Sequence, residues 1–243
     1  MKLSKIEFIE HINTECDVYE NPIPLKAIGV MIHSTAANNP YLKRYVNFPE
    51  RLGENYNKNW FGSYAAYAGG DYTVPHIVIG LDEKDELLAV QILPFSIRAQ
   101  AAGKGKDGLS ANTSHIQIEI CEDARNDKDY FIRAFEGCAE LCAYLENRFG
   151  FSTPDIISHK EGYTMGIASP HGDPEHWLSP FGKDMNWFRE RVDFYFDDPY
   201  NYIEEKVPLY RVQIGAFRVK ENAEKMLEKA KAAGFADAFI KAD

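Results

Sequence analysis

Val30-Met31-Ile32-His33-Ser34-Thr35, residues 30–35, places a histidine and two small hydroxyl residues at the end of an apolar run. The run begins at Ala27, after Pro24, and its composition predicts a buried β-strand. Ile116-Gln117-Ile118-Glu119 and Ile157-Ser158-His159 likewise end on a polar, chemically capable side chain. Because the ends of separate strands can meet in space, we expect these side chains to converge.

Strand-like runs alternate with helical patterns through the first 200 residues. Asp129–Phe149 has apolar residues at helical spacing and is followed by Gly150, a typical C-cap. We predict strands over 27–33, 73–81, 87–93, 113–121 and 156–158, and helices over 4–15, 40–53, 129–149 and 185–196. This order predicts an α/β domain with a mixed central β-sheet flanked by helices.

The C-terminal residues have a pattern of their own. We predict a first domain over 1–200, a linker over 201–207 and a small β-α-β fragment over 208–243. In that fragment we expect a strand over 207–217, a helix over 220–233 and a second strand from 235. So short a piece buries little core by itself.

Composition excludes several classes of protein. A formal charge of −10 argues against nucleic-acid binding, which needs a basic face. An apolar content of 45% is ample for a packed core, yet no apolar run approaches the ~20 residues of a membrane span. The charged start, Met1–Glu10, lacks the apolar stretch of a signal peptide. The cysteines form no CxxC pair, and we expect small core residues at 138 and 142.

The polar strand ends have the chemistry of a zinc hydrolase. A catalytic zinc site needs three protein ligands and an open position. His33 and His159 are two candidate ligands, and His171-Gly172-Asp173-Pro174 offers two more. Glu119 is placed to move a proton, although a strand-end glutamate is also commonly an ion-pair partner.

Five segments in order resemble the type-2 N-acetylmuramoyl-L-alanine amidases, whose fold is shared with peptidoglycan recognition proteins. They are Val30–Thr35, Val74-Pro75-His76-Ile77-Val78-Ile79, Ile116–Glu122, Ile157-Ser158-His159 and Asp173-Pro174. The resemblance covers roughly residues 25–190. It implies hydrolysis of the amide between the N-acetylmuramoyl group and L-alanine in peptidoglycan.

The resemblance also implies roles for single residues. The zinc ligands would be His33, His159 and Asp173, and the catalytic glutamate would be Glu119. A polar residue two positions before the third ligand often completes the site, which places His171 there as a catalytic residue. The alternative is that His171 binds zinc and Asp173 orients it; Pro174 after Asp173 favours the first assignment.

Two further residues are candidates for substrate binding. The family often has a tyrosine before the strand histidine, where this chain has Pro75, so we expect His76 to line the cleft or to be structural. Trp177, with His176, is expected to line the substrate groove. Three other histidines are expected to be non-catalytic: His11, His115 and His176.

The tail carries a second resemblance. Tyr210–Phe217, followed by a helix containing Ala223 and by Gly234-Phe235, is similar to the first half of a SPOR module. Such modules imply binding to the glycan strands of peptidoglycan.

The sequence therefore predicts a Zn²⁺-dependent amidase that acts on the bacterial cell wall, with peptidoglycan as its partner and no insertion into a membrane. We expect it to be secreted or released without a recognisable signal peptide. Two alternatives remain: a non-catalytic peptidoglycan-binding module, and a zinc peptidase that cuts within the stem peptide.

Overall fold

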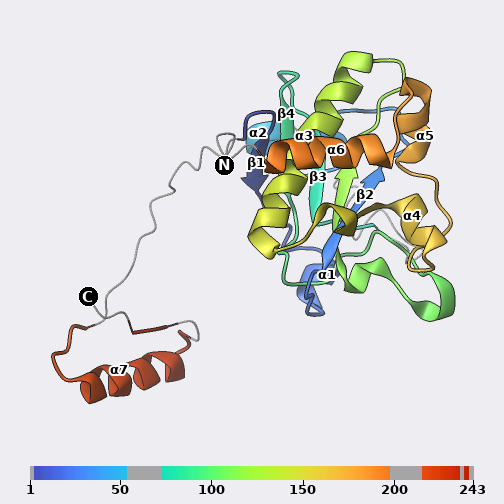
Figure 1. The fold of residues 1–243 in the computed structure, drawn as a ribbon. Helices are drawn as coiled ribbons and strands as arrows, with labels where there is room; N and C mark the ends of the chain where they lie inside the picture. Colours follow the sequence, from blue (N-terminus) through green and yellow to red (C-terminus); the bar gives the residue numbers. More distant parts are fainter. Residues whose placement is uncertain (1–2, 54–72, 198–214, 236–237, 241–243) are drawn as a thin grey trace. The chain divides into compact units, whose positions relative to one another are not determined.

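The chain forms two compact units, residues 1–205 and 206–243. The computed structural model describes residues 3–53, 73–197, 215–235 and 238–240 (Figure 1). The first unit carries all of the β-sheet in the described residues and is considered first.

A six-stranded mixed sheet forms the centre of the first unit, in the order β1-β4-β3-β5-β2-β6. Only the β3–β4 hairpin is antiparallel; the other neighbouring pairs are parallel. The strands are β1 (Glu7–Glu10), β2 (Gly29–Ser34), β3 (Ile77–Leu81), β4 (Leu87–Gln91), β5 (His115–Ile120) and β6 (Ile156–Ser158). The predicted α/β class and its central strands are confirmed.

The two faces of the sheet differ in chemistry because side chains alternate along a strand. Val30, Ile32 and Ile118 point into the main core, which α3 (Lys128–Phe149) and α6 (Met185–Phe196) cover. Figure 1 shows these two helices on the same side of the sheet. His33 and Glu119 alternate with those residues and therefore face the opposite side.

Helix α3 begins and ends where the sequence predicts. The side chain of Asp127 accepts a hydrogen bond from the backbone N–H of Tyr130, which caps the first turn. Gly150 ends the helix in the left-handed conformation, with φ of 74°. Cys138 and Cys142 are buried on its inner face, as expected, and all four cysteines are buried and unpaired.

The remaining short helices lie around the sheet. They are α1 (Asp17–Glu20), α2 (Pro49–Leu52), α4 (His159–Thr164) and α5 (Glu175–Leu178), with 3₁₀ turns η1 (Leu42–Arg44), η3 (Lys106–Gly108), η4 (Ala111–Thr113), η5 (Thr153–Asp155) and η6 (Ser179–Phe181). Helices α4 and α5 fall in the segment between 159 and 180 that has no clear periodic pattern.

Two predicted helices were wrong. Residues 4–15 contain strand β1 instead, because pairing with β4 satisfies its backbone while Phe8 is buried against the core. Residues 40–53 form only η1 and α2. Pro49 excludes the helical conformation at Phe48, whose φ and ψ are −146° and 68°.

In the second unit, helix α7 (Lys220–Ala232) confirms the predicted helix. The strand expected over 207–217 falls largely outside the described residues, and residues 235 and 238–240 of the second expected strand are described but form no strand. Within the described part of the chain, no helix combines the length and apolarity needed to cross a bilayer.

Candidate metal centre

Three ligand-type atoms converge at one end of the sheet. Nδ1 of His33 lies 2.9 Å from Nδ1 of His159. Oδ2 of Asp173 lies 3.4 Å from the first nitrogen and 3.6 Å from the second. Such an arrangement can hold a metal ion, and these three residues form the only such group of His, Cys, Asp or Glu in the described residues.

Strand register brings residues from distant parts of the chain together. His33 on β2 is the register partner of Glu119 on β5, and Ile32 is the partner of Ser158 on β6. His159 therefore follows in the same row as His33. The side chain of Ser158 accepts a hydrogen bond from the backbone N–H of Glu161, so that α4 begins at His159.

Hydrogen bonds hold the outer nitrogen of each imidazole. Nε2 of His33 lies 2.7 Å from Oε1 of Gln117. Nε2 of His159 lies 3.2 Å from Oγ of Ser169, which itself donates to the carbonyl of Ala102. The oxygen of the Gln117 amide only accepts, so Nε2 of His33 donates; Nε2 of His159 donates when the Ser169 hydroxyl proton goes to Ala102. Each neutral ring then keeps its Nδ1 lone pair.

The donor set fits a cation. Two imidazole lone pairs and a carboxylate oxygen repel one another when they share so small a space, and a cation between them removes that repulsion. Two neutral imidazoles and one carboxylate are a common zinc set.

Glu119 is buried beside this centre, on the same face of the sheet. Burial, followed by the negative charges of Asp173 and Glu122, raises the pKa of the Glu119 carboxyl well above its ordinary value. A carboxyl with raised proton affinity beside a metal centre is suited to general acid–base chemistry.

His171 stands apart from the three ligand atoms. Its ring centroid is 4.7 Å from that of His159, and its Nδ1 lies 2.9 Å from Oγ of Ser169. The residue is exposed, whereas Asp173 is buried. Of the two alternatives for the third ligand position, the structure therefore brings Asp173 into the cluster. Lys160 is exposed at the start of α4, and its backbone N–H donates to the Asp173 carbonyl.

Sequence reasoning missed several residues that support the site. Gln117 and Ser169 hold the histidine rings, and neither was singled out. Glu122 accepts hydrogen bonds from Ser34 Oγ at 2.9 Å and from His176 Nε2 at 2.7 Å. The hydrogen bond to Glu122 raises the pKa of His176. The alternation of Gln117 with Glu119 was the one available signal, because it puts both on the face of His33.

The two expected substrate-binding residues are in the interior. Trp177 is 0% exposed and packs its ring against Phe131 and Phe135, so it offers no face to a ligand. His76 is also fully buried, with Nε2 at 2.9 Å from the Ile97 carbonyl and Nδ1 accepting from the Gln117 backbone N–H. The burial of Trp177 gives no support to its expected place in the substrate groove, and the buried contacts of His76 agree with the structural alternative expected for it.

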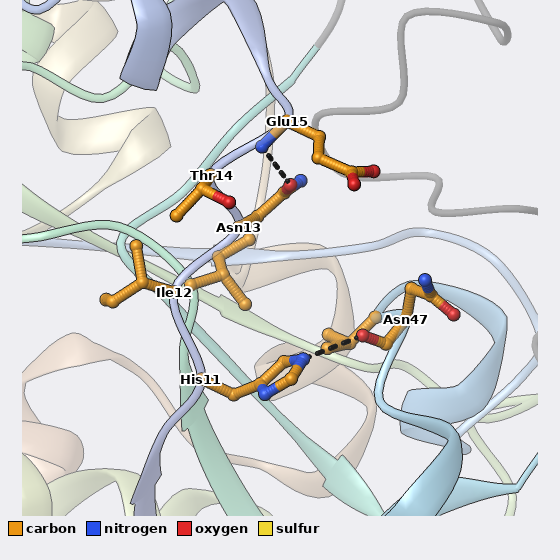
Figure 2. Close-up of a pocket in the computed structure, with 8 residues that line it drawn as sticks. His11, Ile12, Asn13, Thr14, Glu15 and Asn47 are labelled. Carbon is orange, nitrogen blue, oxygen red and sulfur yellow. Dashed lines mark hydrogen bonds between the residues drawn. The ribbon is translucent and has the colours of Figure 1, made fainter.

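A separate pocket lies at the end of β1, with a volume of about 220 Å³ (Figure 2). His11 stacks on Phe48 at 3.9 Å between ring centroids, and its Nε2 bonds to the Asn47 carbonyl at 3.0 Å. Figure 2 shows this ring directed toward Asn47 and the Asn13 side chain capping the N–H of Glu15. The contacts of His11 are thus structural, and β1 lies at the opposite edge of the sheet from β6.

Comparison with known families decides the relationship of the chain. The sequence profile of the N-acetylmuramoyl-L-alanine amidases matches residues 24–176, which are more than half of the chain. The chain belongs to this amidase family. The match contains His33, Glu119, His159 and Asp173 in the order predicted. This amidase-family chain also has a SPOR domain match over residues 183–242, which begins at α6 rather than after the predicted linker.

Solved structures share the fold. The PlyG catalytic domain is 17% identical, with a TM-score of 0.52 over 78% of this chain and 95% of that one. The Staphylococcus aureus hydrolase AmiA, solved with its ligand, is 17% identical, with a TM-score of 0.52 over 81% and 85%. PlyL is 16% identical, with a TM-score of 0.50 over 79% and 97%. No curated protein sequence matches the chain.

Proposed function

We propose that this amidase-family chain is a zinc enzyme that hydrolyses the amide bond between the N-acetylmuramoyl group and L-alanine of peptidoglycan. The observation that carries the proposal is the convergence of His33 Nδ1, His159 Nδ1 and Asp173 Oδ2 on the sheet face that also presents Glu119. Membership of the family supplies the reaction class.

Zinc is the proposed metal because the ligand set is two imidazoles and one carboxylate. The outer nitrogen of each imidazole is held by a hydrogen bond, as is usual for histidines that bind a metal. When bound, zinc supplies Lewis acidity, which polarises a carbonyl and lowers the pKa of a water molecule. The residues of the chain then have to position the substrate and move protons.

Glu119 is the proposed proton carrier. Its buried carboxyl accepts a proton from the attacking water and delivers it to the leaving amine of L-alanine. Burial and the charges of Asp173 and Glu122 raise its pKa, which favours holding that proton between the two steps. A cation held by the three ligands acts in the opposite direction and returns the carboxyl toward its ionised form.

His171 is the proposed partner of the oxyanion that develops on the scissile carbonyl. It is exposed, and its ring lies against that of His159 while Ser169 holds Nδ1. A donor directed at the developing charge contributes about 10²–10³ in rate when it is well placed. Lys160, on the same short helix as His159, is the alternative donor.

The proposed site of action is the bacterial cell wall, with the C-terminal SPOR domain as a second contact to peptidoglycan. We place the domains at residues 1–200 and 208–243, with a linker over 201–207. Helix α6, inside the SPOR match, packs on α3 and supports assigning it to the catalytic domain.

The test uses the purified full chain, peptidoglycan sacculi and mass spectrometry of the soluble products. Zinc-loaded protein is expected to release intact stem peptides that begin with a free L-alanine amino group. Glu119→Gln should abolish release while zinc content stays at the wild-type level. Glu136→Gln is the matched control, because this glutamate pairs with Arg191 on the other side of the sheet.

Each alternative gives its own result. Fragments cut within the stem peptide would indicate a zinc peptidase. Binding to sacculi without any new amino group, in protein that contains zinc, would indicate a non-catalytic module and contradict the proposal.

A further inference from the structure

We propose that Gln117 is a positioning residue that fixes the tautomer of His33, so that Nδ1 is the nitrogen offered to the metal. This inference rests on the proposed zinc function, because its consequence is a metal affinity. Gln117 itself is not a ligand: its side-chain oxygen lies on the far side of the imidazole, at 2.7 Å from Nε2.

The orientation of the Gln117 amide follows from its two other partners. Its Nε2 lies 3.0 Å from the carbonyl of Ala111 and 3.0 Å from the carbonyl of His115. Carbonyl oxygens only accept, so the NH₂ group must point toward them. A flipped amide would place its oxygen against the two carbonyls and its NH₂ group against His33. The hydrogen bonds to both carbonyls would then be lost.

The orientation of the amide then decides the proton position on His33. Oε1 of Gln117 only accepts, so Nε2 of His33 carries the hydrogen and donates it. In the neutral ring Nδ1 is left with its lone pair, and Nδ1 is the atom 3.4 Å from Oδ2 of Asp173. The two backbone carbonyls thus fix the orientation of the Gln117 amide, and the amide oxygen in turn fixes the hydrogen of His33 on Nε2. The nitrogen that faces the other two ligand atoms, Nδ1, is therefore the unprotonated one.

Burial makes this assignment strong. Gln117 is 0% exposed and His33 is 2% exposed, so water cannot readily replace either partner. A buried polar group without a partner is costly, which keeps the whole chain of bonds in one arrangement. The support of His159 is looser, because the single hydroxyl proton of Ser169 can go to Ala102 or to His171.

The decisive variant is Gln117→Leu, which keeps the approximate volume and removes the acceptor. Loss of an outer hydrogen bond to a metal-ligating histidine typically costs about 10–100-fold in metal affinity. We expect that loss in a zinc competition titration with a chromogenic chelator, using the full chain.

A matched control is Gln91→Leu. Gln91 is also buried in the sheet and its amide donates to the Leu93 carbonyl, but it lies on β4, with β3 and β5 between it and β2. A merely structural loss of a buried glutamine would lower stability in both variants. Only the Gln117 variant should lose zinc affinity.

The second readout is spectroscopic and needs no metal. Long-range ¹H–¹⁵N spectra of the metal-free wild-type protein should show His33 protonated at Nε2 alone, and Gln117→Leu should show a tautomer mixture. A wild-type ring protonated at Nδ1, or a Gln117→Leu protein that binds zinc within twofold of wild type, overturns the proposal. Inactive zinc-loaded wild type with the expected tautomer would instead refute the proposed function alone.

Discussion

Glu146, near the end of α3, has a carboxyl group whose ionised form is destabilised by its surroundings in the folded protein. The residue is 2% exposed, and its Oε1 has no hydrogen-bond partner. Burial raises the pKa of this carboxyl, a hydrogen bond from Thr153 offsets part of that effect, and the charges of Asp193 and Asp155 add to it. The result is a pKa raised from 4.5 to about 7.

The sign of the stability effect follows from proton binding. Between pH 4.5 and about 7 the folded protein holds a proton on Glu146 that the unfolded chain has released. Stability therefore falls as pH rises through this window, and at about 1.4 kcal/mol per pKa unit the full cost above it is about 3 kcal/mol. Glu146→Gln removes the titration, so we expect it to stabilise the first unit by up to that amount at alkaline pH.

Urea unfolding followed by tryptophan fluorescence measures this effect. The gain of Glu146→Gln over wild type should be largest at about pH 8.5 and shrink steadily toward about pH 5. The matched control is Glu140→Gln on the same helix. Its carboxylate accepts from the backbone N–H groups of Ser4 and Lys5 at 2.7 Å each, so the same substitution should destabilise by about 1–3 kcal/mol.

A Glu146→Gln protein that shows no gain at alkaline pH would refute this reasoning. So would a gain that is the same at both ends of the pH range, because it would then come from packing or a new hydrogen bond rather than from the proton.

The remaining predictions concern the metal centre and a close backbone contact. Asp173→Ala should lose bound zinc by elemental analysis, whereas His171→Ala should keep it and lower turnover by about 10²–10³; the reverse pattern would exchange their roles. Gly29→Ala should destabilise the protein by about 1–3 kcal/mol in thermal unfolding, because a Cβ there would collide with the Asp155 carbonyl. Gly172→Ala, where a Cβ meets nothing within 4 Å, should change the midpoint little, and equal shifts in the two variants would contradict the steric argument.

Local sequence patterns correctly predicted those strands and helices whose hydrophobic periodicity and end signals lie within the segment itself. The alternation in Ile116–Glu119 predicted a strand and put Glu119 on a polar face, and α3 was set by its period and by Gly150. The same local reasoning failed for residues 4–15. Part of that segment forms β1 because β4 is available as a pairing partner. The pairing partner is distant in sequence, so the local pattern of residues 4–15 contains no information about it.

The candidate site divides in the same way. By itself the sequence determined which residue types stand at the strand ends and before Pro174. It so nominated His33, Glu119 and His159 at strand ends and Asp173 before the proline. The resemblance of the surrounding motifs to a known family then implied which of these residues bind zinc and which one moves the proton. The burial of Trp177 and His76 could not be read from local patterns, because exposure depends on what packs against a side chain, and the Phe131 ring that covers Trp177 is distant in sequence.

Only the tertiary structure decided how the site is assembled. The register of β2 against β5 and β6 brought His33 into line with Glu119 and His159, and the approach of Asp173 rather than His171 completed the cluster. Gln117 acquired its place beside His33 through the same register. Side-chain identity is local, but a metal centre requires atoms a few ångströms apart from segments more than a hundred residues apart, and only the packed sheet fixes those distances.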